Sequence, residues 1–194
     1  MAKTWMITGV SSGFGREMTE QLLSAGDRVI GTVRSTAKVA DLIKKYPDTF
    51  DCVILDVTDA AKVTETVNEA AAKHGRIDVY VSNAGYGLFG AAEELSLEEI
   101  DRILNTNLRG SIAFIRAAIP HLRKQGGGRI IQISSTADRS PTPEILSTTP
   151  PSSALKVSVN PLLRRSRPSG LTLPSSNRAE RARNSVTVRP ASPN

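Results

Sequence analysis

The chain has 194 residues, of which 25 are Lys or Arg and 19 are Asp or Glu, which gives a formal net charge of +6. This length predicts one domain with an appendage. The single cysteine, Cys52, excludes an internal disulfide and fits a reducing compartment. The first residues contain no secretory h-region, and no apolar run approaches the ~20 residues that span a bilayer. We therefore expect a cytoplasmic protein without a membrane partner.

Short apolar runs alternate with segments of helical spacing along the first part of the chain. Strands are predicted at 3–8, 28–33, 51–56, 77–81 and 128–133. Helices are predicted at 14–25, at 37–46, from the N-cap Asp59 to His74, and from Ser96, where Glu99 completes a capping box and Pro120 bends the end. This alternation predicts an α/β fold with a doubly wound parallel sheet of about five strands, with ligands beyond the carboxyl ends of the strands.

The composition changes abruptly near Ala137. All eight aromatic residues precede it, and residues 1–137 carry 16 basic and 16 acidic side chains. Residues 138–194 carry nine basic and three acidic side chains, an excess that equals the net charge of the whole chain. This part is rich in Ser, Pro and Arg and lacks periodicity, which is typical of a largely disordered, low-complexity segment. We therefore divide the chain into a nucleotide-binding domain at 1–136 and a tail at 137–194.

A Gly-rich segment follows the first predicted strand and opens the first predicted helix. Its glycines allow a tight turn and a close approach of the backbone to a pyrophosphate, and the first N–H groups of the helix face the phosphates. An ordinary Gly-rich turn is the alternative interpretation. The residues expected to bind a cofactor here are Gly9, Ser11, Ser12, Gly13, Phe14 and Gly15.

Five motifs in order resemble those of the short-chain dehydrogenase/reductase family. The Gly-xxx-Gly-x-Gly spacing is followed by Asp56-Val57, Asn83-Ala84-Gly85, Asn105-Thr106-Asn107 and Ile133-Ser134-Ser135. The resemblance covers residues 3–136. It implies a Rossmann-like fold, a nicotinamide cofactor and hydride transfer between that cofactor and a ketone or secondary alcohol. It also implies that the cofactor contacts Asp56, Val57, Asn83, Ala84 and Gly85.

The end of the second predicted strand bears on the choice between NAD(H) and NADP(H). An acidic residue at this place binds the ribose 2′-hydroxyl of NAD. This chain instead has Val33 followed by Arg34. Because a guanidinium holds a 2′-phosphate bidentately, Arg34 favours NADP(H) over NAD(H). A solvated surface arginine beside a packed Val33 is the alternative.

The resemblance assigns the proton chemistry to four residue types, of which this chain has two. It implies that Ser135 polarises the substrate oxygen and that Asn107 supports a proton-relay water; purely structural roles are the alternative. The Tyr and Lys of the Tyr-xxx-Lys motif are absent, since Thr148 and Ser152 stand at their expected positions. A Thr hydroxyl is too weak an acid to replace a phenol, and Ser supplies no cation. We therefore expect this chain to be catalytically inactive.

The tail is consistent with a shifted reading frame. Codons for Tyr-His-Ala-Thr-Lys, read one base late, give Thr-Thr-Pro-Pro-Ser, the sequence at residues 148–152. Loss of one base near Thr136-Ala137 would remove the last two strands of the sheet, expose the fifth strand as an apolar edge and compromise an oligomer interface. A genuine disordered basic tail is the alternative.

Three functions remain open at this point. The first is an oxidoreductase by descent, acting on a small carbonyl or alcohol in its in-frame parent but inactive as written. The second is a non-catalytic NADP(H)-binding remnant. The third is a polyanion-binding tail around Arg164, Arg165 and Arg167, although the absence of aromatics for base stacking disfavours nucleic acid. The two histidines have no Cys or carboxylate at metal-ligand spacing, so no metal site is expected.

Overall fold

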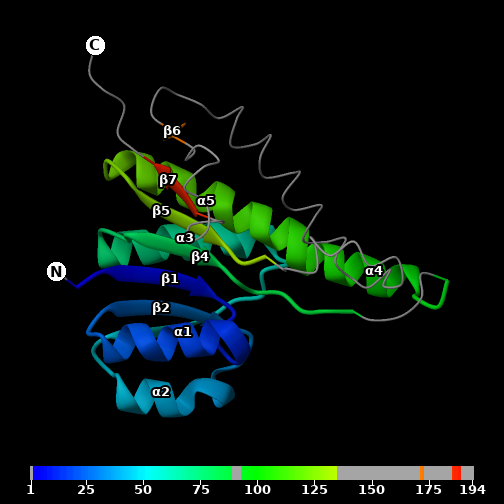
Figure 1. The fold of residues 1–194 in the computed structure, drawn as a ribbon, viewed down its shortest axis with the longest axis horizontal. Helices are drawn as coiled ribbons and strands as arrows, with labels where there is room; N and C mark the ends of the chain where they lie inside the picture. Colours follow the sequence, from blue (N-terminus) through cyan, green and yellow to red (C-terminus); the bar gives the residue numbers. More distant parts are fainter. Residues whose placement is uncertain (1, 89–92, 135–170, 173–184, 189–194) are drawn as a thin grey trace, which may run out of the picture.

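The computed structural model describes residues 2–88 and 93–134, together with the backbone of the short segments 171–172 and 185–188. Five parallel strands lie side by side in the order β3-β2-β1-β4-β5 (Figure 1). They are β1 (Thr4–Thr8), β2 (Arg28–Val33), β3 (Phe50–Ile54), β4 (Val79–Ser82) and β5 (Gly128–Gln132). The predicted α/β fold with a parallel, Rossmann-like sheet is confirmed.

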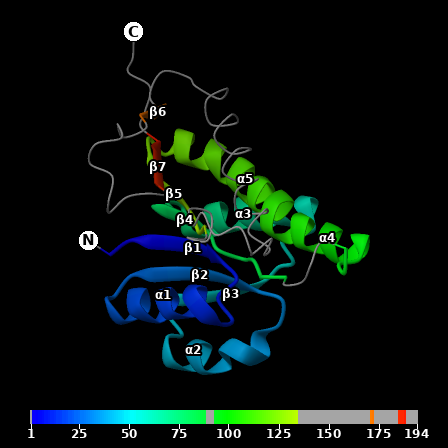
Figure 2. The same cartoon turned by 45° about the vertical axis from the view of Figure 1, so that its right-hand side comes forward.

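Helices cover both faces of this sheet (Figures 1 and 2). One face carries α1 (Gly13–Ser24), the short 3-10 helix η1 (Thr36–Val39) and α2 (Ala40–Lys45). The other face carries α3 (Ala60–His74) and α5 (Ser111–Lys124), and α4 (Leu97–Leu104) extends beyond the sheet. Strand order reverses between β1 and β4, and in open sheets of this kind ligands bind at that point.

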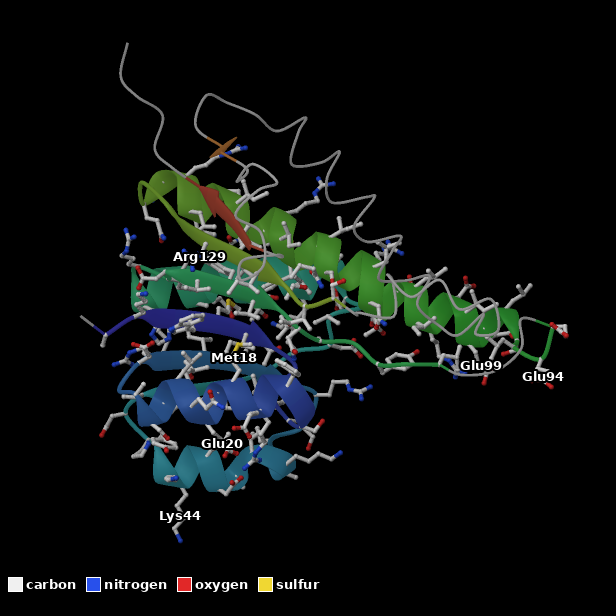
Figure 3. The ribbon with its side chains drawn as sticks, viewed as in Figure 1. Met18, Glu20, Lys44, Glu94, Glu99 and Arg129 are labelled. Carbon is white, nitrogen blue, oxygen red and sulfur yellow. The ribbon has the colours of Figure 1, made fainter. Side chains whose placement is uncertain are left out.

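The two faces bury two separate apolar clusters. Because successive side chains of a strand point to opposite faces, Met6 packs under α3 and α5 while Ile7 packs under α1 and α2, and both are fully buried. Figure 3 shows Met18 of α1 between its helix and the sheet, whereas Lys44 of α2 projects outward. Strands buried on both faces explain the near-continuous apolar runs of the sequence.

The free edge expected at β5 is paired in the structure. The segment β7 (Ser185–Val188) lies antiparallel to β5, with Ile131 opposite Ser185 and Gly128 opposite Val188, and β6 (Leu171–Thr172) lies antiparallel to β7. The expectation of an unpaired edge is therefore wrong for the backbone of β5. The rest of the tail lies outside the described residues, including Arg164, Arg165 and Arg167.

The two predicted N-caps are confirmed, whereas the helix predicted at 37–46 begins as the 3-10 segment η1 and becomes α-helical only at Ala40. The long helix also contains an irregularity that was not expected. The side chain of Asp59 accepts a hydrogen bond from the backbone N–H of Lys62 at 2.9 Å, and Ser96 and Glu99 form a complete capping box. The predicted long helix is interrupted between α4 and α5 by a π-helical segment, η2 (Asn105–Gly110). Such segments occur frequently at functional sites.

Candidate cofactor-binding site

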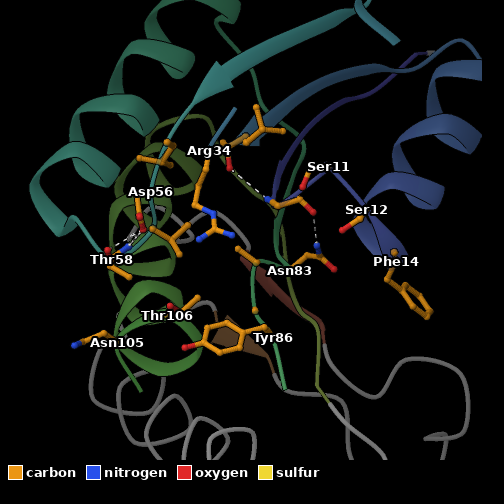
Figure 4. Close-up of a pocket in the computed structure, with 18 of the residues that line it drawn as sticks. Ser11, Ser12, Phe14, Arg34, Asp56, Thr58, Asn83, Tyr86, Asn105 and Thr106 are labelled. Carbon is orange, nitrogen blue, oxygen red and sulfur yellow. Dashed lines mark hydrogen bonds between the residues drawn. The ribbon is translucent and has the colours of Figure 1, made fainter. Parts of the chain in front are cut away.

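A cavity of about 870 Å³ opens at the carboxyl ends of the parallel strands (Figure 4). Every residue predicted to bind the cofactor lines it except Gly15, which lies beneath the turn. The predicted residues are Gly9, Ser11, Ser12, Gly13, Phe14, Arg34, Asp56, Val57, Asn83, Ala84 and Gly85. The residues that sequence reasoning did not assign to the cofactor are Thr32, Val33, Leu55, Thr58, Tyr86, Arg102, Asn105 and Thr106.

The Gly-rich turn brings three backbone segments within contact distance. Gly9 has a φ of +74°, and a Cβ built on it would lie 2.9 Å from the Cα of Ala84. A Cβ on Gly15 would overlap the carbonyl oxygen of Gly9 and the amide of Asn83. Ser12 occupies the N-cap of α1 without making a side-chain capping bond, so the first N–H groups of the helix lack an internal acceptor. The turn therefore presents backbone N–H donors at a cavity, which suits an anionic ligand.

The side chains of Thr8 and Asn83 lock the ends of β1 and β4 together. Thr8 is 1% exposed, and its Oγ1 accepts hydrogen bonds from the backbone N–H groups of Asn83 at 2.9 Å and Ala84 at 3.0 Å. In return, Nδ2 of Asn83 donates to the carbonyl oxygens of Thr8 at 2.9 Å and Gly9 at 3.0 Å. Asn83 is thus a scaffold residue of the cavity wall. A polar residue closing an apolar strand was the sequence signal for Thr8.

The part of the cavity where the family resemblance predicts the adenosine contains two charged side chains, those of Asp56 and Arg34. The carboxylate of Asp56 has hydrogen-bond partners, whereas the guanidinium of Arg34 has none among the described residues. Oδ1 of Asp56 accepts hydrogen bonds from the backbone N–H of Thr58 at 2.9 Å and from its hydroxyl at 2.8 Å. These bonds hold the pKa of Asp56 below its usual value, and the charge of Arg34 adds to the lowering. Arg34 is exposed, and within the described residues its guanidinium makes no hydrogen bond or ion pair. It points into the cavity in Figure 4 and is available to an anionic ligand.

Arg16, the other arginine beside the Gly-rich turn, is already engaged. Its Nε donates to Glu20 at 2.7 Å, one terminal nitrogen donates to the carbonyl oxygen of Lys38 at 2.6 Å, and the other pairs with Asp41. The hydrogen bonds to Asp41 and Glu20 raise the pKa of Arg16. Arg16 therefore links α1 to η1 and α2, and its guanidinium is already paired within the protein.

Asn107 of η2 holds the segment that follows β4. Its Nδ2 donates to the carbonyl oxygen of Tyr86 at 2.8 Å, and its Oδ1 accepts from the backbone N–H of Tyr86 at 3.1 Å. A Cβ on Gly85 would lie 3.1 Å from the same Oδ1, a tight contact that would push the Asn107 side chain back by a few tenths of an ångström. The structure therefore gives Asn107 a positioning contact. Its role toward a proton-relay water stays a prediction, and Ser135 lies outside the described residues, as do Thr148 and Ser152.

Within residues 2–88 and 93–134, no group of three or more His, Cys, Asp or Glu side chains is placed to hold a metal ion. The described helices also include none with the length and apolar character needed to cross a membrane.

A family model described as "short chain dehydrogenase" matches residues 3–162 of the chain. The chain belongs to this family. The match continues beyond residue 136, the boundary drawn from the sequence, and that boundary stays a prediction. The family members are oxidoreductases that bind nicotinamide cofactors and act on small molecules.

Two curated relatives illustrate the similarity. "Oxidoreductase BOA17" of Botryotinia fuckeliana is 38% identical over 140 residues, which are 72% of this chain and 51% of the relative. A "3-ketodihydrosphingosine reductase" of Bacteroides thetaiotaomicron is 35% identical over 130 residues, 67% of this chain and 46% of the relative. The chain thus spans about half the length of the curated relatives it matches.

Solved structures agree with this assignment. A short-chain dehydrogenase from Streptomyces avermitilis superposes with a TM-score of 0.78 at 35% identity, covering 84% of this chain and 60% of that one. The structure titled "ElxO with NADP Bound" has a TM-score of 0.72 at 30% identity and covers 84% of this chain and 65% of that one. That neighbour binds NADP.

Proposed function

We propose that this chain binds NADP(H) in the cavity beyond β1, β2 and β4 and does not itself turn over a substrate. The observation that carries the proposal is the unpaired guanidinium of Arg34 at the end of β2, in the same cavity as the Gly-rich turn and the start of α1. Val33 at this strand end is 2% exposed and apolar, so no carboxylate is present there to accept a ribose 2′-hydroxyl.

The residues of the cavity fit the parts of such a cofactor. The turn of Gly9 to Gly13 and the start of α1 would hold the pyrophosphate, and Asp56 and Val57 would lie beside the adenine. In active members of the family, the nicotinamide of this cofactor supplies the hydride. Asn107 fixes the backbone of Tyr86, which lines the same cavity, and so keeps that wall in place.

The inactivity follows from what the chain lacks. In the family's chemistry a phenol exchanges a proton with the substrate oxygen and a lysine lowers the pKa of that phenol. The last tyrosine of this chain is Tyr86, and no tyrosine is followed by Lys four residues later. We propose that a single lost base near codon 137 removed this pair from an in-frame parent that interconverts a ketone and a secondary alcohol. The nucleotide sequence around codon 137 tests this directly, because incompatible triplets would refute the shift.

Binding is tested by titrating NADPH and NADH into the wild-type chain and the Arg34→Ala variant. Loss of a charge-assisted contact costs about 1.5–3 kcal/mol, so the affinity for NADPH should fall about 10- to 100-fold, whereas that for NADH should change less than about threefold. Arg28→Ala is the matched control, because Arg28 is an exposed arginine at the opposite end of β2. An equal loss for both cofactors would show that Arg34 does not read the 2′-phosphate.

Turnover is tested separately with NADPH and a panel of ketones. We expect no oxidation of NADPH above background. Robust activity that disappears in the Ser135→Ala variant would show that the chain has a complete catalytic centre.

A further inference from the structure

The cavity has a second arginine that no motif predicted. Arg102 lies in the last turn of α4 and lines the cavity together with Asn105 and Thr106. Arg34 follows β2 and points into the cavity in Figure 4, whereas Arg102 belongs to α4, so the two lining arginines come from different elements of the fold. The hydroxyl of Thr106 donates to the carbonyl oxygen of Arg102 at 3.0 Å, which ties this turn of the helix to the lining segment.

The carboxylate of Glu99, three residues before Arg102, is already hydrogen-bonded within the N-cap of α4. Glu99 accepts hydrogen bonds through Oε2 from the backbone N–H of Ser96 at 3.0 Å and from its hydroxyl at 2.8 Å. These bonds lower the pKa of Glu99, and the charge of Arg102 adds to the effect without an ion pair between them. Arg102 is exposed, and its guanidinium makes no hydrogen bond or ion pair with any other described residue.

The charges along the cavity therefore favour an anion. The charged side chains among the described lining residues are Arg34, Arg102 and Asp56, and the carboxylate of Asp56 is satisfied by Thr58. The N-terminus of α1 adds a partial positive charge at the same cavity. Two unpaired arginines in one cavity, together with the N-terminus of α1, suit an anionic ligand that carries a phosphate in addition to a pyrophosphate.

We propose that Arg102 is a second specificity residue for the cofactor, which binds the 2′-phosphate from α4 while Arg34 binds it from β2. This inference rests on the proposed binding of NADP(H). It goes further because it assigns selectivity to a residue of α4, outside the Gly-rich turn and the end of β2. Phosphate oxygens offer enough acceptor sites for two guanidinium groups.

The test uses two nucleotide fragments that differ in the phosphate alone. Adenosine 2′,5′-bisphosphate and adenosine 5′-monophosphate are titrated calorimetrically into the wild-type chain and the Arg34→Ala, Arg102→Ala, Arg102→Lys and Arg109→Ala variants. Arg109→Ala is the matched control, because Arg109 is an exposed arginine on the adjoining η2 that does not line the cavity. Alanine suits a helix, so an exposed Arg102→Ala change should leave the fold intact, and thermal unfolding of each variant verifies this.

We expect Arg102→Ala to weaken the bisphosphate about tenfold and the monophosphate less than about twofold. Arg102→Lys should give an intermediate loss, since lysine keeps the charge but not the planar fork. An equal loss for both fragments would place Arg102 at the base or the 5′-phosphate, and no loss for either would remove it from the site; both outcomes overturn the proposal. If Arg34→Ala loses the preference for the bisphosphate over the monophosphate and Arg102→Ala keeps it, the role of Arg102 is refuted while the proposed binding of NADP(H) stands. If the wild-type chain binds neither fragment, the proposed function fails with it.

Discussion

Replacing Thr8 by valine tests whether the bridge between β1 and β4 stabilises the site. The side chains are similar in shape, but valine cannot accept the backbone N–H groups of Asn83 and Ala84. Each buried donor left unsatisfied costs about 1–3 kcal/mol. Because Asn83 and Ala84 are only partly buried, we expect a combined loss near the lower end, about 2–3 kcal/mol in the free energy of unfolding.

Urea unfolding followed by the fluorescence of Trp5 measures this loss. Thr8→Ser is the decisive companion, because it keeps the hydroxyl and loses one methyl group at a cost of about 1 kcal/mol. Thr64→Val is the control at an exposed site, where the hydroxyl donates to Ala60 within α3, and a change within about 0.5 kcal/mol is expected. If Thr8→Val is as stable as Thr64→Val, or more stable than Thr8→Ser, the hydrogen bonds to the Thr8 hydroxyl do not contribute the predicted free energy of unfolding.

Two further predictions address the turn and an ion pair. A Gly15→Ala change forces a Cβ into the backbone of the cradle and should weaken NADPH binding about tenfold or more, about 1.4 kcal/mol. Gly75→Ala, at a φ of +71° in open space, should cost about 1–2 kcal/mol of stability and leave NADPH affinity unchanged, as calorimetry would show. Burial raises the pKa of Asp51, but the hydrogen bonds from Lys73 and His74 outweigh it and leave the pKa lowered. The stability from Asp51 is therefore present above its unfolded pKa of about 3.9 and is lost as pH falls through the lower folded value. In the Asp51→Asn variant, the free energy of unfolding should fall less steeply below about pH 4 than in the wild-type chain. Urea unfolding at several pH values measures this, and the same fall in both proteins would contradict the prediction.

Local sequence signals were sufficient to predict the parallel strands, the starts of α3 and α4, and the Gly-rich turn before α1. The alternation of apolar runs predicted the parallel strands, and the capping residues Asp59 and Ser96 marked the starts of α3 and α4. The glycines of the turn could be interpreted because their spacing reflects a steric need, which is visible where a Cβ on Gly15 would meet Gly9. Each of these features depends on residues within a few positions of one another.

The missed features depend on contacts between distant parts of the chain. The π-helical segment η2 ends at Gly110, where a Cβ would lie 2.8 Å from the carbonyl oxygen of Val57, and nothing near Gly110 in the sequence indicates that approach. In the sequence, nothing distinguishes Arg102 from other charged residues on helices. Only the structure shows that it lines the same cavity as Arg34. The pairing of β7 with β5 joins segments more than fifty residues apart and had no periodic signal in the tail.

The central claim is that this chain binds a phosphorylated nicotinamide dinucleotide in the cavity at the ends of its strands. Calorimetric titration of the 194-residue chain with NADPH, and in parallel with NADH, tests it most directly. We predict saturable binding of one NADPH per chain, at least about tenfold tighter than NADH, as expected for one charge-assisted phosphate contact. No binding of either nucleotide at millimolar concentration, or binding of NADH as tight as that of NADPH, would contradict the account.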